Sequence, residues 1–154
     1  MRKKFLLIGN GKMGSSFVYP LRNLFDFTIV DPNTTPDFPC NHLHCIQDLR
    51  GNFDYVTFAV KPFTIREVLE ELNLDLFHKN TTYLSVIAGA NREFYERMLG
   101  PQSKIALCMP NLPVRVGKGV VAVYSDHKIG FLDELGQIVY VQNEDEISRH
   151  LFGF

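Results

Sequence analysis

One glycine-rich segment carries the clearest chemical signal in the sequence: it reads Gly9-Asn10-Gly11-Lys12-Met13-Gly14 and matches the pattern G-x-G-x-x-G. It follows an expected strand and opens an expected helix, which is the context of a dinucleotide-binding loop. Gly9 suits a tight turn, Gly11 lets the backbone approach a pyrophosphate, and Gly14 permits close packing of helix on strand. The first amides of the helix would face the anion. The pattern therefore predicts a pyrophosphate-binding loop.

An acidic residue follows at the distance that such a site requires. Asp31 ends the second expected strand, roughly 20 residues after Gly9, where a carboxylate accepts a hydrogen bond from the adenosine ribose 2′-OH. The same charge would repel a 2′-phosphate, and no Arg or Lys occurs between Pro32 and Pro39. These residues favour NAD(H) over NADP(H). The alternative is an Asp that only starts the turn before Pro32.

Three further segments lie where expected strands end. Ligands of open α/β sheets bind outside the carboxyl ends of the strands, so these segments would line one crevice with the glycine loop. Lys61 precedes a proline and is held extended. Gly89 allows a flat ring to come close, and Asn111 offers a donor and an acceptor to a carboxamide or a small substrate. The segments are Ala59-Val60-Lys61-Pro62, Ser85-Val86-Ile87-Ala88-Gly89 and Met109-Pro110-Asn111-Leu112-Pro113, and the residues expected at the ligand are 59–62, Ala88, Gly89, Met109, Pro110 and Asn111.

The elements that must position these residues alternate between strand and helix. Apolar runs predict strands at 5–9, 27–31, 54–60, 82–88, 104–108, 119–124 and 137–141. Amphipathic stretches predict helices at 13–24 (disturbed by Pro20), 64–74, 91–100 and 128–135, and a last one from Asn143. Thr64 and Glu67 form a capping-box pattern. The expected fold is α/β, a Rossmann-type doubly wound, mostly parallel sheet with helices on both faces, as a single NAD(P)-binding domain over 1–154.

Composition excludes several classes of protein. The 154 residues carry 16 Lys and Arg against 17 Asp and Glu, and no basic footprint for nucleic acid is present. No apolar run reaches the roughly 18 residues of a membrane span. The first residues predict a buried strand rather than a signal peptide. Three cysteines are too few for a disulfide framework, which favours a cytoplasmic location.

Two cysteine-containing features have plain structural interpretations. The segment 40–45 holds two cysteines and two histidines, but its spacing differs from that of structural zinc sites, so we expect no metal. Cys108 is expected to be a buried, inert thiol. The apolar tail Leu151–Phe154 could either contact a partner or pack on its own sheet.

The order of four motifs resembles the N-terminal domain of pyrroline-5-carboxylate reductase. These motifs are G-x-G-x-M-G, V-K-P, S-x-x-A-G and M-P-N-x-P with Gly117 and Gly119 behind it, and the resemblance runs from about Phe5 to Glu146. It implies hydride transfer from NAD(P)H to a cyclic imine, as in proline biosynthesis. It also implies that the glycine loop holds the pyrophosphate, Lys61 and Pro62 flank the adenosine, and Ala88, Gly89 and 109–111 lie near the nicotinamide and substrate.

The family's second, all-helical domain, which completes the substrate site and forms the dimer, is not expected within these 154 residues. No catalytic residue can therefore be named. A homodimer or a complementing helical domain would have to close the site. The alternative is a non-catalytic dinucleotide-binding module with a regulatory role. A reductase of another G-x-G-x-M-G family, such as a deazaflavin-dependent NADP reductase, fits less well because of M-P-N-x-P and Asp31.

Overall fold

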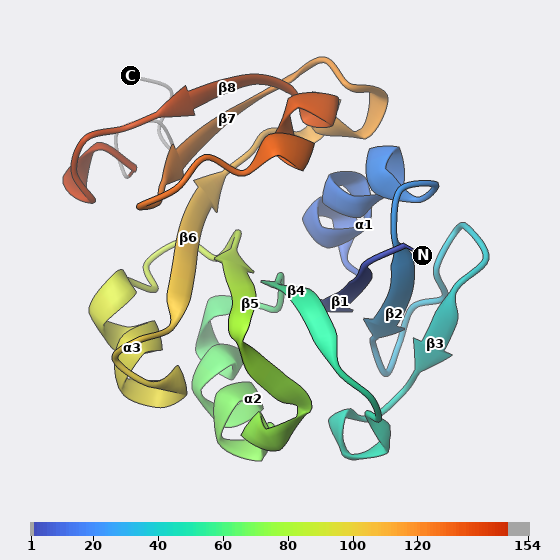
Figure 1. Cartoon of the computed structure of the whole chain (residues 1–154). Coiled ribbons are helices and arrows are strands. Elements are labelled where there is room, and N and C mark those ends of the chain that lie inside the picture. Colours follow the sequence, from blue (N-terminus) through green and yellow to red (C-terminus); the bar gives the residue numbers. More distant parts are fainter. Residues whose placement is uncertain (1, 148–154) are drawn as a thin grey trace.

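The computed structural model describes residues 2–147 and shows one eight-stranded sheet with helices on both faces (Figure 1). The strands are β1 (Lys4–Ile8), β2 (Asp26–Val30), β3 (Asn41–Leu43), β4 (Phe53–Phe58), β5 (Phe77–Ser85), β6 (Lys104–Met109), β7 (Gly119–Tyr124) and β8 (Gly136–Tyr140). The α-helices are α1 (Lys12–Val18), α2 (Ile65–Glu71) and α3 (Arg92–Leu99). Short 3₁₀ turns include η1 (Tyr19–Leu21), η3 (Pro62–Thr64), η5 (Leu112–Val116) and η6 (Gly130–Leu135).

The sheet has the strand order β3-β2-β1-β4-β5-β6-β7-β8. The first six strands are parallel to one another, β7 runs antiparallel to β6, and β8 is parallel to β7. An order that reverses between β1 and β4 is that of a Rossmann-type sheet, with its switch point beside the end of β1. The predicted fold class is confirmed.

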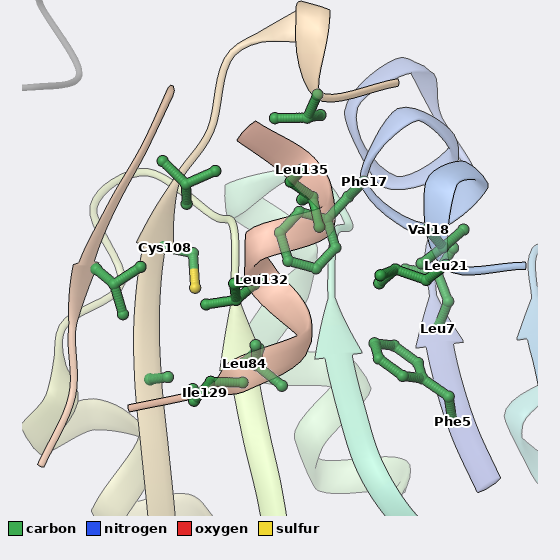
Figure 2. Close-up of a cluster of buried hydrophobic side chains, with 14 of the residues drawn as sticks. Phe5, Leu7, Phe17, Val18, Leu21, Leu84, Cys108, Ile129, Leu132 and Leu135 are labelled. Atoms are coloured by element: carbon green, nitrogen blue, oxygen red, sulfur yellow. The ribbon is translucent and has the colours of Figure 1, made fainter. Parts of the chain in front are cut away.

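Two apolar cores cover the two faces of the sheet. One lies under α1, η5 and η6, and its side chains include Phe5, Leu7, Phe17, Leu132 and Leu135, all fully buried (Figure 2). The other lies under α2 and α3. Cys108 is buried in the first core, and this burial raises the pKa of its thiol to about 12. The prediction of an inert thiol agrees with that environment.

Local sequence signals explain where the helices begin and end. Pro20 has no N–H and cannot continue an α-helix, so α1 ends at Val18 and one 3₁₀ turn follows. Asn91 begins α3 by accepting a hydrogen bond from the Phe94 amide at 2.9 Å, and Gly100 ends it with a φ of 118°. Both predicted boundaries of α3 are confirmed, whereas the helix predicted over 13–24 ends at Val18 because of Pro20.

The predicted capping box at Thr64 is wrong. Pro62 starts the 3₁₀ turn η3 ahead of α2, so Thr64 already has helical backbone angles. Its hydroxyl donates to the Lys61 carbonyl at 2.8 Å and caps no amide. β5 also begins earlier than predicted, at Phe77, and its pairing with β4 is irregular between Phe77 and Thr82. The helix predicted from Asn143 and the tail Leu151–Phe154 extend beyond the described residues.

Candidate cofactor site

The carboxyl ends of five parallel strands form one straight edge. Paired positions place Ile8, Val30, Phe58, Ser85 and Leu107 side by side across β2, β1, β4, β5 and β6. The residues that follow this row are the ones predicted to bind a cofactor or substrate. The topology therefore brings the glycine loop, Asp31, 59–62, 88–89 and 109–111 to the same edge of the sheet.

The glycine loop is built by direct contact between backbones. Gly9 has a φ of 100°, and a Cβ there would lie 2.7 Å from the carbonyl carbon of Ala59. A Cβ on Gly14 would overlap the carbonyl oxygen of Gly9. Gly9 and Gly14 are thus required by the protein's own packing, because the loop, the start of α1 and the end of β4 come together without side chains.

Gly11 has a different environment from the other two glycines. A Cβ at Gly11 would meet no protein atom within 4 Å, so its space is open. Gly11 is the N-cap of α1, and among residues 2–147 no side chain caps the first amides of this helix, whereas Asn91 caps α3. Free amides beside open space are what an incoming phosphate requires. Within the described residues, Gly9–Gly14 therefore fits the pyrophosphate of a dinucleotide.

Asp31 joins the glycine loop to the segment after β2. One carboxylate oxygen, Oδ2, accepts the Asn10 amide at 2.8 Å, and Oδ1 accepts the amides of Asn33 and Thr34, each at 2.8 Å. Burial tends to raise the pKa of Asp31, but these backbone hydrogen bonds outweigh it and leave the pKa below its usual value. Asp31 is therefore ionised at neutral pH, and its carboxylate holds the glycine loop and the segment after β2 together.

The same hydrogen-bond network includes the backbone and the side chain of Asn10. Its amide donates to Asp31, its carbonyl accepts the Thr34 hydroxyl at 3.0 Å, and its side chain donates to the Thr34 Oγ1 at 3.1 Å. Asn10 is buried, unlike Gly11, Lys12 and Met13. That Asn10, as part of the glycine loop, contacts the cofactor stays a prediction, and within the protein its backbone holds two loops together.

The segments after β4 and β5 face a common hollow. Pro62, Ala88 and Gly89 line a cavity of about 500 Å³ between the starts of α2 and α3. Lys61 has the extended backbone expected before a proline, with φ −64° and ψ 145°. Ala59, Val60, Ala88, Met109 and Pro110 are half-buried, while Lys61, Pro62, Gly89 and Asn111 are exposed. All are placed where a ligand could reach them.

Asn111 has its amide oriented by the protein. Its Oδ1 accepts the Val120 amide at 2.9 Å, which links the end of β6 to the start of β7. The Nδ2 group is the remaining polar group of the side chain. Asn111 can therefore donate to a ligand through Nδ2, while one of the two lone pairs of its predicted acceptor is already used within the fold.

The histidine and cysteine segment shows no sign of a metal centre. Among residues 2–147, no group of three or more His, Cys, Asp or Glu side chains is placed to hold a metal ion. The ring centroids of His42 and His44 lie 4.6 Å apart, and His42 forms a hydrogen bond through Nε2 with the Asp31 carbonyl oxygen at 3.2 Å.

None of the helices within residues 2–147 has the length and apolar character needed to cross a membrane.

Sequence reasoning missed one buried pair at this edge. Ser85 Oγ and Tyr95 Oη lie 2.5 Å apart, and both side chains are buried. Ser85 belongs to the predicted S-x-x-A-G motif, but its partner lies on α3. Only the apolar face of that helix signals that Tyr95 points toward the sheet.

Comparison with known proteins connects this site to a family. No family model matches the chain. The pyrroline-5-carboxylate reductase of Escherichia coli is 30% identical over 134 residues, which cover 80% of this chain and 49% of that protein. The enzyme of Aquifex aeolicus is 40% identical over 51% of this chain and 28% of its own length. The chain thus spans at most about half the length of these two curated relatives.

Solved structures show the same fold. A pyrroline-5-carboxylate reductase from Coxiella burnetii superposes with a TM-score of 0.83 at 24% identity, over 97% of this chain and 63% of that one. The Plasmodium falciparum pyrroline carboxylate reductase, solved with NADP bound, gives 0.79 at 23% identity, over 94% and 59% of the two chains. In sequence and in fold, this chain is similar to the pyrroline-5-carboxylate reductases over about half of their length.

Proposed function

We propose that the chain binds a nicotinamide dinucleotide along the carboxyl edge of the sheet and forms the cofactor half of an enzyme that reduces a cyclic imine by hydride transfer. The observation that carries this proposal is the glycine loop. Gly9 and Gly14 are required by packing, whereas Gly11 faces open space beside uncapped amides. Bound there, the dinucleotide would supply the hydride. The similarity to pyrroline-5-carboxylate reductases supports the cyclic imine as the proposed substrate class.

We further propose that the cofactor is NAD(H) rather than NADP(H), although the relative from Plasmodium falciparum was solved with NADP. Oδ1 of Asp31 already accepts two amides and Oδ2 accepts one, so at most one acceptor position remains for a ribose hydroxyl. The preference therefore rests chiefly on the buried negative charge and on the lack of Arg or Lys between 32 and 39.

A partner would have to cover the nicotinamide face during hydride transfer, because water must be excluded from that step. A second copy of the chain or a complementing helical domain could do so. The exposed apolar side chains of Leu112, Val116 and Val120 lie close to Asn111 in the chain, and Val120 is bonded to it. They support contact with a partner on this side of the molecule.

Titration with NADH and NADPH, followed by cofactor fluorescence, tests the binding proposal. The variant Gly11→Val should lose binding by at least about 10-fold, since its side chain would occupy the phosphate's space. Gly130→Val is the matched control, because a Cβ at Gly130 also meets no protein atom within 4 Å and lies in η6. Equal binding by wild type and Gly11→Val would overturn the proposal.

Oxidation of either cofactor with pyrroline-5-carboxylate as acceptor tests the catalytic part. Turnover with NADH would support the full proposal. Binding without turnover would instead favour the alternative, a non-catalytic dinucleotide-binding module that acts on a partner.

A further inference from the structure

A buried hydrogen bond closes the base of the loop that carries Ala88 and Gly89. Ser85 ends β5, Tyr95 lies on α3 ten positions later, and their hydroxyl oxygens are 2.5 Å apart. Ser85 is 2% exposed and Tyr95 is 1% exposed. A bond between two groups shielded from water is strongly favoured over leaving either of them unpaired.

Either hydroxyl can be the donor in this bond. Burial raises the pKa of Tyr95 to about 12, so its phenol stays protonated at neutral pH and the bond joins two neutral hydroxyls. Ser85 Oγ also accepts the Ile87 amide at 3.2 Å. The Ser85 oxygen is thus bonded both to α3, through Tyr95, and to the loop after β5, through the Ile87 amide. A second bond, from the Val86 amide to the Phe58 carbonyl at 3.1 Å, fixes the loop to β4.

The ring of Tyr95 packs under the neighbouring loop as well. It stacks on Phe58, with centroids 5.8 Å apart and planes 16° from parallel. Phe58 is the last residue of β4 and directly precedes Ala59, whose carbonyl group lies against Gly9. One side chain on α3 therefore contacts the base of two segments that the proposed cofactor would touch.

We propose that Tyr95 is a positioning residue for the nicotinamide half of the site: through Ser85 and the Ile87 amide it holds Ala88 and Gly89 in place for the ring. The inference rests on the proposed function. It also makes a separate prediction, because the hydroxyl of Tyr95, unlike its ring, is bonded within residues 2–147 only to Ser85 at the end of β5 and should matter for the nicotinamide alone.

The test compares NADH with ADP-ribose, which lacks the nicotinamide. Tyr95→Phe keeps the ring and removes only the hydroxyl. It should weaken NADH binding by about 3- to 10-fold, the range expected for one hydrogen bond, and leave ADP-ribose binding unchanged. Exchange of the Ile87 amide with solvent deuterium should also become faster in the free protein, which gives a readout that needs no cofactor.

Tyr83→Phe is the matched control. Tyr83 lies on β5, is also buried, and stacks on the same Phe58 ring at 6.3 Å, but among residues 2–147 its hydroxyl has no protein hydrogen-bond partner. Tyr83→Phe should leave the affinities for NADH and ADP-ribose unchanged, and it should not change the rate of deuterium exchange at the Ile87 amide. Equal losses for both ligands in Tyr95→Phe, or an unchanged NADH affinity, would overturn the inference while the proposed function stands. Wild type that binds neither ligand would overturn both.

Discussion

The Asp31 carboxylate accepts the Asn10 amide at 2.8 Å and thereby ties the glycine loop to the end of β2. The residue expected to read the ribose is also the one that shapes the loop beneath the pyrophosphate. Its effects on cofactor choice and on folding are therefore coupled, and a substitution at Asp31 has to be measured for both.

Asp31→Asn should lower the free energy of unfolding by about 1–3 kcal/mol, because an amide NH₂ cannot accept the backbone donors that one carboxylate oxygen now satisfies. Urea unfolding with and without NADH measures both effects. Asp26→Asn is the control: Asp26 lies at the other end of β2, and its 3.6 Å ion pair with Arg2 is exposed, so the loss should stay below about 1 kcal/mol. Equal losses of unfolding free energy in the two variants would contradict a structural role of the Asp31 carboxylate in joining the two loops.

The same carboxylate gives a pH dependence with a defined sign. The pKa of Asp31 is lower in the folded protein than its usual value, so the folded state binds the proton less well than the unfolded state. The contribution is fully present above about pH 4 and is lost as the pH falls through the lowered folded pKa. Wild type should therefore lose stability below pH 4 more steeply than Asp31→Asn, as measured by urea midpoints between pH 2.5 and 6.

Gly14→Ala should destabilise the fold, in contrast to Gly11→Ala. The new methyl group at position 14 would overlap the Gly9 carbonyl oxygen and lie 3.0 Å from the Ala59 side chain, both held by backbone contacts. A loss of about 1–3 kcal/mol is typical of overpacking. Gly11→Ala meets no protein atom and should stay within about 1 kcal/mol of wild type, the cost of a poorer N-cap. Thermal unfolding of the two variants without ligand distinguishes packing from binding.

Much of this architecture is predictable from the sequence because the signals are local. Apolar runs mark the parallel strands, and the context of G-x-G-x-x-G marks the switch point. Asn91 and Gly100 bound α3 through groups adjacent in the chain. Each of these signals acts within one element, so nothing distant overrides it.

The contacts that escaped prediction join distant elements or depend on a neighbouring turn. Thr64 matches a capping box by spacing, but the turn begun by Pro62 changes its backbone angles. Asp31 directly follows β2 at the expected position, but its carboxylate oxygens accept hydrogen bonds from backbone amides of two loops. Tyr95 reaches Ser85 only because α3 packs on β5 and β6. Spacing in the sequence carries no information on such pairings.

The three cysteines should react at very different rates. Cys45 is exposed, Cys40 is half-buried, and burial raises the pKa of the Cys40 thiol, with Asp37 acting in the same direction. Cys108 is fully buried. A thiol reagent at pH 8 should modify Cys45 first, Cys40 more slowly, and Cys108 only after unfolding. Mass spectrometry of timed samples gives the order, and early modification of Cys108 would mean that the first core is open.

Two buried threonines should respond to the same substitution with opposite signs. Among residues 2–147, the Thr57 hydroxyl in the middle of β4 has no hydrogen-bond partner, whereas Thr81 donates to the Phe53 carbonyl at 2.8 Å and accepts the His78 amide at 3.1 Å. Thr57→Val removes an unpaired polar group at nearly constant shape and should stabilise the chain by up to about 1 kcal/mol. Thr81→Val should cost about 1–3 kcal/mol, because it leaves the Phe53 carbonyl and the His78 amide without that partner. Urea midpoints of the two variants measure the difference, and a loss of stability in Thr57→Val equal to that in Thr81→Val would show that the Thr57 hydroxyl is bonded after all.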